Sequence, residues 1–217
     1  MRVAIVIPAL NEAATVGGVV AAVSEFGTPV VVDDGSSDRT AAKAAAAGAA
    51  VVSHDQTLGY DHALASGFAW ADAHDFEVVA TIDADAQHDP ELLAGLLRPI
   101  ERGEAAMVLG IRPAPARVSE RVFSAYARWR FGIADILCGM KAYTIELYRA
   151  HRAVMDLPSI GTALAWAAMR DASRFTTIDV PIRPRQGSGR FGRGLRANGR
   201  ILRALWFAVR ADLLRQG

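Results

Sequence analysis

The sequence predicts a single α/β domain with a mostly parallel, doubly wound sheet. Two features of the 217-residue chain support this prediction. Short β-branched runs alternate with alanine-rich stretches over the first 110 residues, which is the order of βαβα units. The runs are also continuous and apolar, as in central strands that helices cover on both faces. In such sheets ligands bind beyond the carboxyl ends of the strands, so the residues that follow each run are the first candidates for a site.

Five apolar runs are the expected strands: residues 3–7, 30–32, 50–52, 78–82 and 107–109. Four intervening stretches are long enough for helices: residues 12–25, 39–47, 61–74 and 91–102. After Arg112 the alternation ends at Pro113-Ala114-Pro115. Residues 118–131 then show helical spacing of four apolar side chains, which we expect to pack in the core: Val118, Val122, Tyr126 and Trp129.

The C-terminal part combines a glycine-rich basic loop, residues 185–194, with a final helix at residues 195–215. We therefore expect a main domain over residues 1–194 and a C-terminal amphipathic basic helix over residues 195–217. On a helical wheel five apolar residues share one narrow face: Leu195, Leu202, Trp206, Val209 and Leu213. Arginines occupy the side and rear: Arg196, Arg200, Arg203 and Arg210. This pattern predicts contact with an anionic membrane surface, and the alternative is a stripe packed on the body of the protein.

Composition and charge narrow the class of protein. The net charge of +1 hides an asymmetry, because residues 181–217 hold nine arginines and one acid. Such a tail suits a phosphate or a membrane surface, and we expect no nucleic-acid partner. The one cysteine, Cys138, excludes an internal disulfide and a multi-cysteine zinc site. With no apolar run of roughly 18 residues and no signal-peptide pattern, we expect a cytoplasmic protein with a peripheral contact to the inner face of the membrane.

An acidic turn follows the fourth expected strand. Asp83-Ala84-Asp85, with Gln87 two residues further on, brings two carboxylates and an amide to the edge of the sheet. Negative charge there is costly unless a cation or hydrogen-bond donors neutralise it. Oxygen ligands suit Mg²⁺ or Mn²⁺, which keep open positions for substrate phosphates. Asp83, Asp85 and Gln87 are therefore candidate metal ligands, although the motif by itself is also compatible with a simple acidic turn.

Two further polar segments follow the first and second strands. Pro8-Ala9-Leu10-Asn11-Glu12 comes after the first strand, and Asp33-Asp34-Gly35 comes after the second. An acid in the second segment can accept hydrogen bonds from a nucleotide base or a ribose hydroxyl, as acids do in dinucleotide-binding folds. Helix capping by Ser36, Ser37 or Asp38 explains the polar residues nearby, but not two adjacent carboxylates at the end of a buried strand.

Together the three segments resemble the signatures of family 2 glycosyltransferases: IPALNE, VVVDDGSSDRT and TIDADAQHDPE. The resemblance covers about residues 3–195 and is closest to the dolichol-phosphate or polyprenol-phosphate mannose and glucose synthases. It implies the GT-A nucleotide-sugar fold in a single domain. It also implies an inverting enzyme that uses Mg²⁺ or Mn²⁺. The implied reaction moves a sugar from a nucleotide diphosphate sugar, of the GDP-mannose or UDP-glucose type, to a polyprenyl phosphate.

The resemblance also implies roles for individual residues. Asp83, Asp85 and Gln87 would hold the metal, and Asp135, in DILCGMKAY, lies on the acceptor side. Asp85, Arg112 and Asp135 are the candidate catalytic residues, with none assigned as a general base. The implied donor site has two parts. The nucleotide and metal segments contribute Pro8, Leu10, Asn11, Glu12, Val32, Asp34, Asp83 and Ala84, and the implied phosphate contacts are Arg112, Arg185 and Arg190.

One stretch departs from the family pattern. Asp61 and His62 stand where relatives have small residues after the third strand. This departure, with the lack of a membrane span, favours the alternative of a soluble hydroxyl acceptor such as a glycan or a small molecule. A non-catalytic nucleotide-binding protein is a third hypothesis, against which the paired carboxylates Asp83 and Asp85 argue. A dinucleotide oxidoreductase is disfavoured because no G-x-G-x-x-G follows the first strand.

Overall fold

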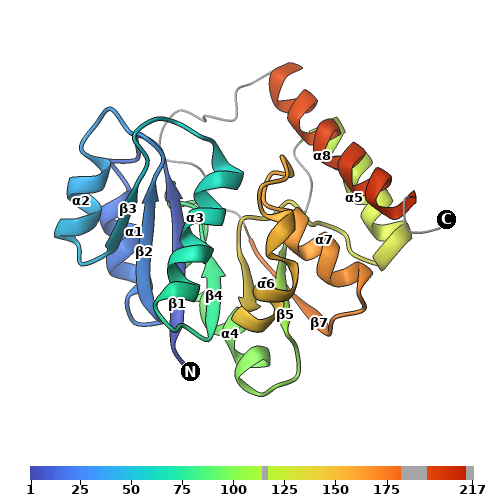
Figure 1. Ribbon diagram of the computed structural model, residues 1–217, viewed down its shortest axis with the longest axis horizontal. Helices are drawn as coiled ribbons and strands as arrows, with labels where there is room; N and C mark the ends of the chain where they lie inside the picture. Colours follow the sequence, from blue (N-terminus) through green and yellow to red (C-terminus); the bar gives the residue numbers. More distant parts are fainter. Residues whose placement is uncertain (114–116, 182–194, 214–217) are drawn as a thin grey trace.

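The computed structural model describes residues 1–113, 117–181 and 195–213. Within this part the strands form one seven-stranded sheet in the order β3-β2-β1-β4-β6-β5-β7 (Figure 1). Helices flank the sheet, and the amino-terminal and carboxyl-terminal helices lie at opposite ends of the molecule (Figure 1). The predicted single α/β domain is therefore confirmed.

The first half of the chain forms the parallel part of the sheet. β1 (Val3–Ala9) lies between β2 (Thr28–Asp33) and β4 (Val78–Thr81), and β3 (Ala50–Ser53) pairs with the outer side of β2. All of these pairs are parallel, as the alternation of apolar runs and helices predicts. The side chains of β4 and of residues 3–7 are buried, which explains why both segments are apolar without interruption.

The second half makes the sheet mixed. β6 (Lys141–Thr144) runs antiparallel to both β4 and β5 (Met107–Ile111), and β7 (Phe175–Asp179) pairs in parallel with β5. Neither β6 nor β7 is among the strands expected from the sequence. β6 is a short segment that begins with lysine, and β7 has three exposed residues, so neither forms a continuous apolar run.

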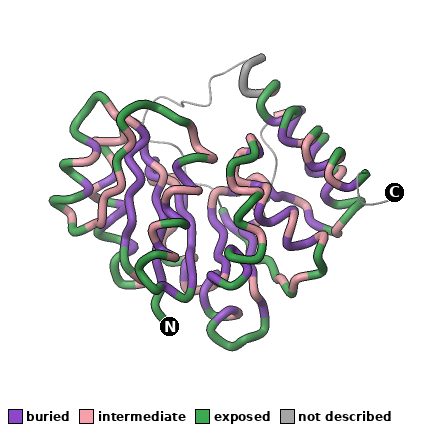
Figure 2. Tube along the Cα trace, in the orientation of Figure 1, coloured by how far each residue is buried: buried purple, intermediate pink, exposed green. Residues whose placement is uncertain are grey.

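Helices cover both faces, as a doubly wound sheet requires. One core cluster lies under three helices: α1 (Val16–Val23), α2 (Thr40–Ala46) and α4 (Leu92–Glu101). The other cluster draws on five: α3 (Tyr60–Ala73), α5 (Val118–Phe131), α6 (Ile145–His151), α7 (Ala163–Arg170) and α8 (Leu195–Leu213). A 3-10 turn, Arg152–Val154, follows α6. Figure 2 shows the strands as a mainly buried layer.

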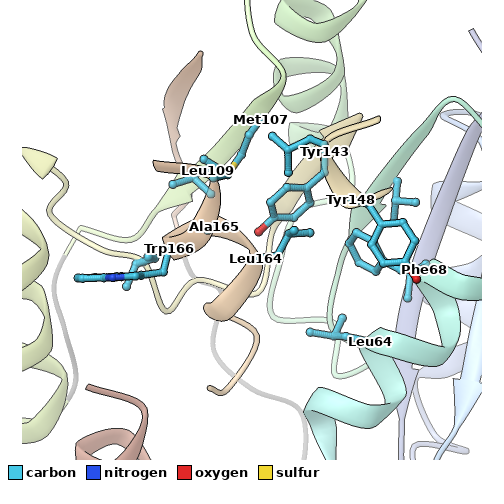
Figure 3. Close-up of a cluster of buried hydrophobic side chains, with 14 of the residues drawn as sticks. Leu64, Phe68, Met107, Leu109, Tyr143, Tyr148, Leu164, Ala165 and Trp166 are labelled. Atoms are coloured by element: carbon cyan, nitrogen blue, oxygen red, sulfur yellow. The ribbon is translucent and has the colours of Figure 1, made fainter. Parts of the chain in front are cut away.

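Aromatic side chains join the two halves of the fold. Phe68 of α3 lies 5.7 Å from Tyr143 of β6 and 5.3 Å from Tyr148 of α6, measured between ring centroids (Figure 3). Trp166 of α7 continues the cluster toward Phe123 of α5, at 5.8 Å. Because these rings come from elements far apart in the chain, the parallel and mixed parts of the sheet share one core.

The expectation for residues 118–131 is wrong in one respect. The helix is present, but Val118 and Trp129 are 73% and 77% exposed, and Val122 is exposed as well. The buried face of α5 carries Phe123 and Ala127, and Tyr126 packs against the same core. Three polar residues of the helix are also buried: Ser119, Glu120 and Ser124. Spacing alone could not reveal this. When a helix has polar residues on both faces, the elements that pack against it decide which face is buried.

The C-terminal helix is packed into the body through a different face from its apolar stripe. Ile201, Ala204 and Ala208 of α8 are buried in the shared core, whereas Leu202 and Trp206 are 48% and 52% exposed. The alternative expectation, in which the apolar stripe packs on the body of the protein, is therefore wrong for Leu202 and Trp206. No helix in residues 1–113, 117–181 and 195–213 combines the length and the hydropathy that a membrane span requires.

We expect opposite effects from adding a methyl group at Gly67 and at Gly18. A Cβ on Gly67 would lie 3.0 Å from a methyl carbon of Val6 and 3.2 Å from one of Val32, whereas nothing lies within 4 Å at Gly18. Gly67→Ala should lower the free energy of unfolding by about 1–3 kcal/mol through overpacking. Gly18→Ala, in the exposed part of α1, should raise it by up to about 1 kcal/mol. Urea unfolding measures both, and a stabilising Gly67→Ala would contradict the close packing of α3 on the sheet.

Candidate active site

The loops that follow β1 and β2 start side by side at the carboxyl edge of the sheet. Ala9 pairs with Asp33 at the ends of these strands. Beyond them, the Ser37 amide donates a 2.7 Å hydrogen bond to Oδ1 of Asn11, and the Asn11 amide donates one of 2.7 Å to Oγ of Ser36. Asn11 has φ 48°, in the left-handed region that asparagine tolerates. Asn11 thus joins the two loops, and the helix expected from residue 12 begins only at Val16 because the chain turns here first.

The structure separates the residues predicted to bind the donor into two groups. Pro8, Leu10 and Glu12 are partly exposed in the strand end and loop of β1, so their side chains can reach a ligand at the edge. Val32 and Ala84 are buried in the two core clusters. Their side chains stabilise the strand ends, so any contact of these two positions with the donor would come from the backbone.

Asp34 is held by the protein on both carboxylate oxygens. Oδ1 lies 2.8 Å from Nδ1 of His54 and accepts the Leu58 amide at 2.9 Å, and Oδ2 accepts the Gly59 amide at 2.8 Å. His54 is itself fixed by Ser66, with Nε2 2.9 Å from Oγ. A carboxylate has about four acceptor positions, so one remains for a further donor such as the predicted ribose hydroxyl.

The acidic turn after β4 brings together the three predicted metal ligands and two residues beside them. Oδ1 of Asp83 accepts a 3.1 Å hydrogen bond from the hydroxyl of Tyr60, and Oδ1 of Asp85 accepts one of 3.1 Å from the backbone amide of Gln87. The side chain of Asp83 is 31% exposed and Asp85 is buried. His88 Nδ1 lies 3.8 Å from Oδ2 of Asp83 and is buried without a hydrogen-bond partner.

These residues fit a divalent cation that shares its coordination with a substrate. Within the described ranges, no three His, Cys, Asp or Glu side chains gather closely enough to hold a metal ion by themselves. Mg²⁺ is typically held by one or two carboxylates while substrate phosphates supply other ligands, which agrees with the Asp83–Asp85 turn. The unpartnered nitrogen of His88 marks the same place, because a buried polar atom without a partner is costly unless a ligand or water meets it.

Arg112 and Asp135, which the sequence places in separate motifs, form one ion pair. Nε of Arg112 donates to Oδ2 of Asp135 at 2.6 Å, and its NH2 nitrogen donates to Oδ1 at 3.0 Å. Burial raises the pKa of Asp135, but the hydrogen bonds and charge of Arg112 outweigh it and lower that pKa. The Arg112 guanidinium also lies 3.6 Å from Glu120. A buried carboxylate in this state is a weak base, so the geometry favours a role of Asp135 in holding Arg112.

Lys141 of β6 is buried and pairs with Thr81, near the end of the strand that precedes the acidic turn. Its ammonium nitrogen donates a 2.7 Å hydrogen bond to the carbonyl of Gly161, and burial lowers its pKa to about 8. His54 carries no signal of a site in the sequence, because only tertiary contacts bring it to Asp34. Tyr60 directly precedes the departure at Asp61 and His62, and Lys141 lies within DILCGMKAY, so only their positions pointed to these two residues. Arg185 and Arg190 lie outside the described residues.

Comparison with known proteins identifies the family. The model of glycosyl transferase family 2 matches residues 4–157. The chain belongs to glycosyl transferase family 2. Undecaprenyl-phosphate mannosyltransferase of Micrococcus luteus is 31% identical over 180 residues, which cover 74% of this chain and 72% of the relative. Polyprenol monophosphomannose synthase of Mycolicibacterium smegmatis is 28% identical over 209 residues, covering 83% and 76%. The protein is therefore a glycosyltransferase.

Solved structures agree with the GT-A fold. Glucosyl-3-phosphoglycerate synthase from Mycobacterium tuberculosis, in complex with phosphoglyceric acid, superposes with a TM-score of 0.75 at 25% identity, covering 96% of this chain and 80% of that one. A complex of the same synthase with Mn²⁺, UDP and glucosyl-3-phosphoglycerate gives a TM-score of 0.74 at 26% identity, with coverages of 97% and 79%. The Mn²⁺ and UDP of the second complex agree with the prediction of a divalent cation and a nucleotide diphosphate donor.

Removing the charge of Asp135 should cost stability at neutral pH and less in acid. We expect Asp135→Asn to lower the free energy of unfolding at pH 7 by about 3 kcal/mol, because it removes the bidentate partner of Arg112 and leaves only the longer contact to Glu120. The folded-state pKa of Asp135 lies below 3.8, so the stabilisation is present above that value and is lost as the pH falls through the folded-state pKa. Urea unfolding between pH 3 and pH 7 should show a smaller loss on acidification in the variant, and parallel profiles would contradict this account.

Proposed function

We propose that this protein transfers a sugar from a nucleotide diphosphate sugar to a polyprenyl phosphate, with inversion at the anomeric carbon. The family and the edge-site geometry support sugar transfer. The lipid acceptor is supported by two relatives named for polyprenol and undecaprenyl phosphate, and above all by the surface of α5 and α8. Asp83, Asp85 and Gln87 are proposed to hold Mg²⁺ or Mn²⁺. The bound cation would supply positive charge against the diphosphate as it leaves.

The residues of the site divide the remaining tasks. Asn11 shapes the loops that would receive the nucleotide, and Asp34 offers its remaining acceptor position to a ribose hydroxyl. Arg112, oriented by Asp135, would stabilise the charge of the departing diphosphate, and the proposal gives Arg185 and Arg190 the same task. A phosphate acceptor is anionic at neutral pH and needs no strong general base, which agrees with the lowered pKa of Asp135.

The helices α5 and α8 turn apolar side chains to solvent, and α8 lies along α5 (Figure 1). We call these exposed residues the α5–α8 surface: Val118, Val122, Trp129, Leu202, Trp206 and Leu213. Exposed apolar groups of this size, with two tryptophans, are unusual on a protein that meets only water, and they suit the interface of a bilayer. A surface of this kind would bring the site to an acceptor whose tail lies in the membrane.

The charges on the same helices favour an anionic bilayer over a second copy of the chain. Among the described side chains of α5 and α8, both acids are buried: Glu120 pairs with Arg117, and Asp212 pairs with Arg130 and Arg170. The exposed charges on the two helices are arginines: Arg121, Arg128, Arg130, Arg200, Arg203 and Arg210. Arginines attract anionic lipid headgroups, whereas two such surfaces would repel each other.

A soluble acceptor is the second candidate. The structural relative with a TM-score of 0.75 is a synthase solved with phosphoglyceric acid. Asp61, one of the departures from the family pattern, lines a pocket beside the acidic turn with Gly139 and Lys141. A small phosphorylated or hydroxylated acceptor would need no membrane surface, so the two candidates differ in what α5 and α8 do.

Sugar transfer to undecaprenyl phosphate should require a divalent cation. Purified protein given UDP-glucose or GDP-mannose, Mg²⁺ or Mn²⁺, and undecaprenyl phosphate is expected to form a glycosyl phospholipid detectable by mass spectrometry. Excess EDTA and Asp85→Ala should each abolish the product, because both remove the cation from the diphosphate. Product formed from phosphoglycerate or a hydroxyl acceptor, but not from the lipid, would overturn the proposed acceptor. Full turnover in EDTA would contradict the metal role.

Binding to anionic vesicles should depend on the α5–α8 surface. Sedimentation with phosphatidylglycerol vesicles at low salt is expected to pellet the protein, and Trp129→Ser with Trp206→Ser should weaken this binding at least tenfold through lost burial. Arg203→Glu with Arg210→Glu should also weaken binding, and the loss should grow with the fraction of anionic lipid in the vesicles. Arg102→Glu, an exposed arginine on neither helix, is the matched control. Equal binding of all variants, or none by the wild type, would remove the support that the α5–α8 surface gives to a lipid acceptor.

A further inference from the structure

The first turn of α3 contacts both sides of the pocket beside the acidic turn. Tyr60 donates its hydroxyl hydrogen to Oδ1 of Asp83 at 3.1 Å. The next residue, Asp61, accepts three hydrogen bonds from the loop before α7: the Ser159 hydroxyl at 3.1 Å, the Ile160 amide at 3.1 Å and the Gly161 amide at 2.7 Å. Two consecutive side chains therefore link the proposed metal carboxylate to a loop nearly a hundred residues away in the chain.

The loop at residues 159–161 presents two backbone amides to one carboxylate. Ile160 and Gly161 have φ values of 56° and 68°, in the left-handed region, and both of their amides donate to Asp61. Such a conformation is strained for a β-branched residue and persists only when its surroundings hold it. The carboxylate of Asp61 holds both amides, and Lys141 binds the Gly161 carbonyl at 2.7 Å.

Asp83 is confined on its other sides as well. A Cβ on Gly139 would lie 2.8 Å from the carboxyl carbon of Asp83, so a glycine is required there for Asp83 to keep its place. His88 faces the second oxygen at 3.8 Å. Within this confined space the Tyr60 hydroxyl provides a directional hydrogen bond, and a hydrogen bond of this kind sets the orientation of a metal-binding carboxylate.

We propose that Tyr60 and Asp61 act as a pair of positioning residues that couples the metal-binding carboxylate to the 159–161 loop. Tyr60 orients Asp83, and Asp61 keeps the loop in its left-handed conformation by supplying an internal anion. Because both side chains leave the same helical turn, displacement of one moves the other. This coupling concerns donor and metal binding and holds for either acceptor.

The effect of Tyr60 is measured directly as metal binding. Electron paramagnetic resonance of Mn²⁺, titrated into protein with UDP or GDP, should give a dissociation constant roughly tenfold higher for Tyr60→Phe than for wild type, because second-layer hydrogen bonds typically matter by that factor. Tyr126→Phe, which removes a hydroxyl bonded to Asp212 away from the site, is the matched control and should bind Mn²⁺ as wild type does. Unchanged Mn²⁺ affinity in a folded Tyr60→Phe overturns the role of Tyr60.

The effect of Asp61 is measured as hydrogen exchange of the Ile160 and Gly161 amides. Asp61→Ala should exchange these amides at least tenfold faster, and added formate should restore their protection by taking the place of the lost carboxylate, whereas chloride at the same ionic strength should not. Saturating Mn²⁺ with nucleoside diphosphate should slow this exchange in wild type but not in Tyr60→Phe. Unchanged exchange in Asp61→Ala, or a metal effect that survives Tyr60→Phe, overturns the coupling. No arm uses an acceptor, so a failure here is separate from a failure of the lipid assay.

Discussion

The need to neutralise carboxylates at one edge of the sheet organises this protein. Parallel strands deliver their carboxyl ends to the same edge, and the chain places acids there. Most of them are matched internally: Asp34 by His54 and two amides, Asp61 by the 159–161 loop, and Asp135 by Arg112. Asp83 differs, since among the described residues it accepts one hydrogen bond, from the Tyr60 hydroxyl, and has the His88 ring nitrogen 3.8 Å away. A carboxylate with so few donors is the position at which the proposed cation, and the diphosphate that it would hold, would supply the missing positive charge.

The core explains how two dissimilar parts of the sheet keep this edge in place. α3 packs on the parallel strands through Gly67, and Phe68 on the same helix meets Tyr143 of the antiparallel strand β6. The same helix begins with the residues that touch Asp83 and the 159–161 loop. Rigid packing along α3 therefore sets the geometry at its first turn, and the contacts between the two halves of the site follow from the contacts between the two halves of the core.

The helices α5 and α8 show why an apolar stripe does not always mark the core. Both helices are amphipathic, but α5 enters the core through Phe123 and Ala127, and α8 enters it through Ile201, Ala204 and Ala208. The buried acids Glu120 and Asp212 form ion pairs with arginines, so neither carboxylate reaches the exposed apolar side chains. Large apolar side chains remain at the surface beside arginines, an arrangement that water alone does not favour.

The sequence by itself determined the parallel half of the fold and the acidic turn. Its continuous apolar runs require burial on both faces, and polar residues that follow such runs must lie at the strand ends. Only the tertiary structure decided the rest. β6 and β7 contain polar residues and form no continuous apolar run, so they are not recognised before they pair. The partners Tyr60–Asp83 and Arg112–Asp135 lie 23 residues apart. The exposed side of α5 was likewise undetermined, because hydrophobic periodicity reports that a helix has two faces and not which of them a neighbour will cover.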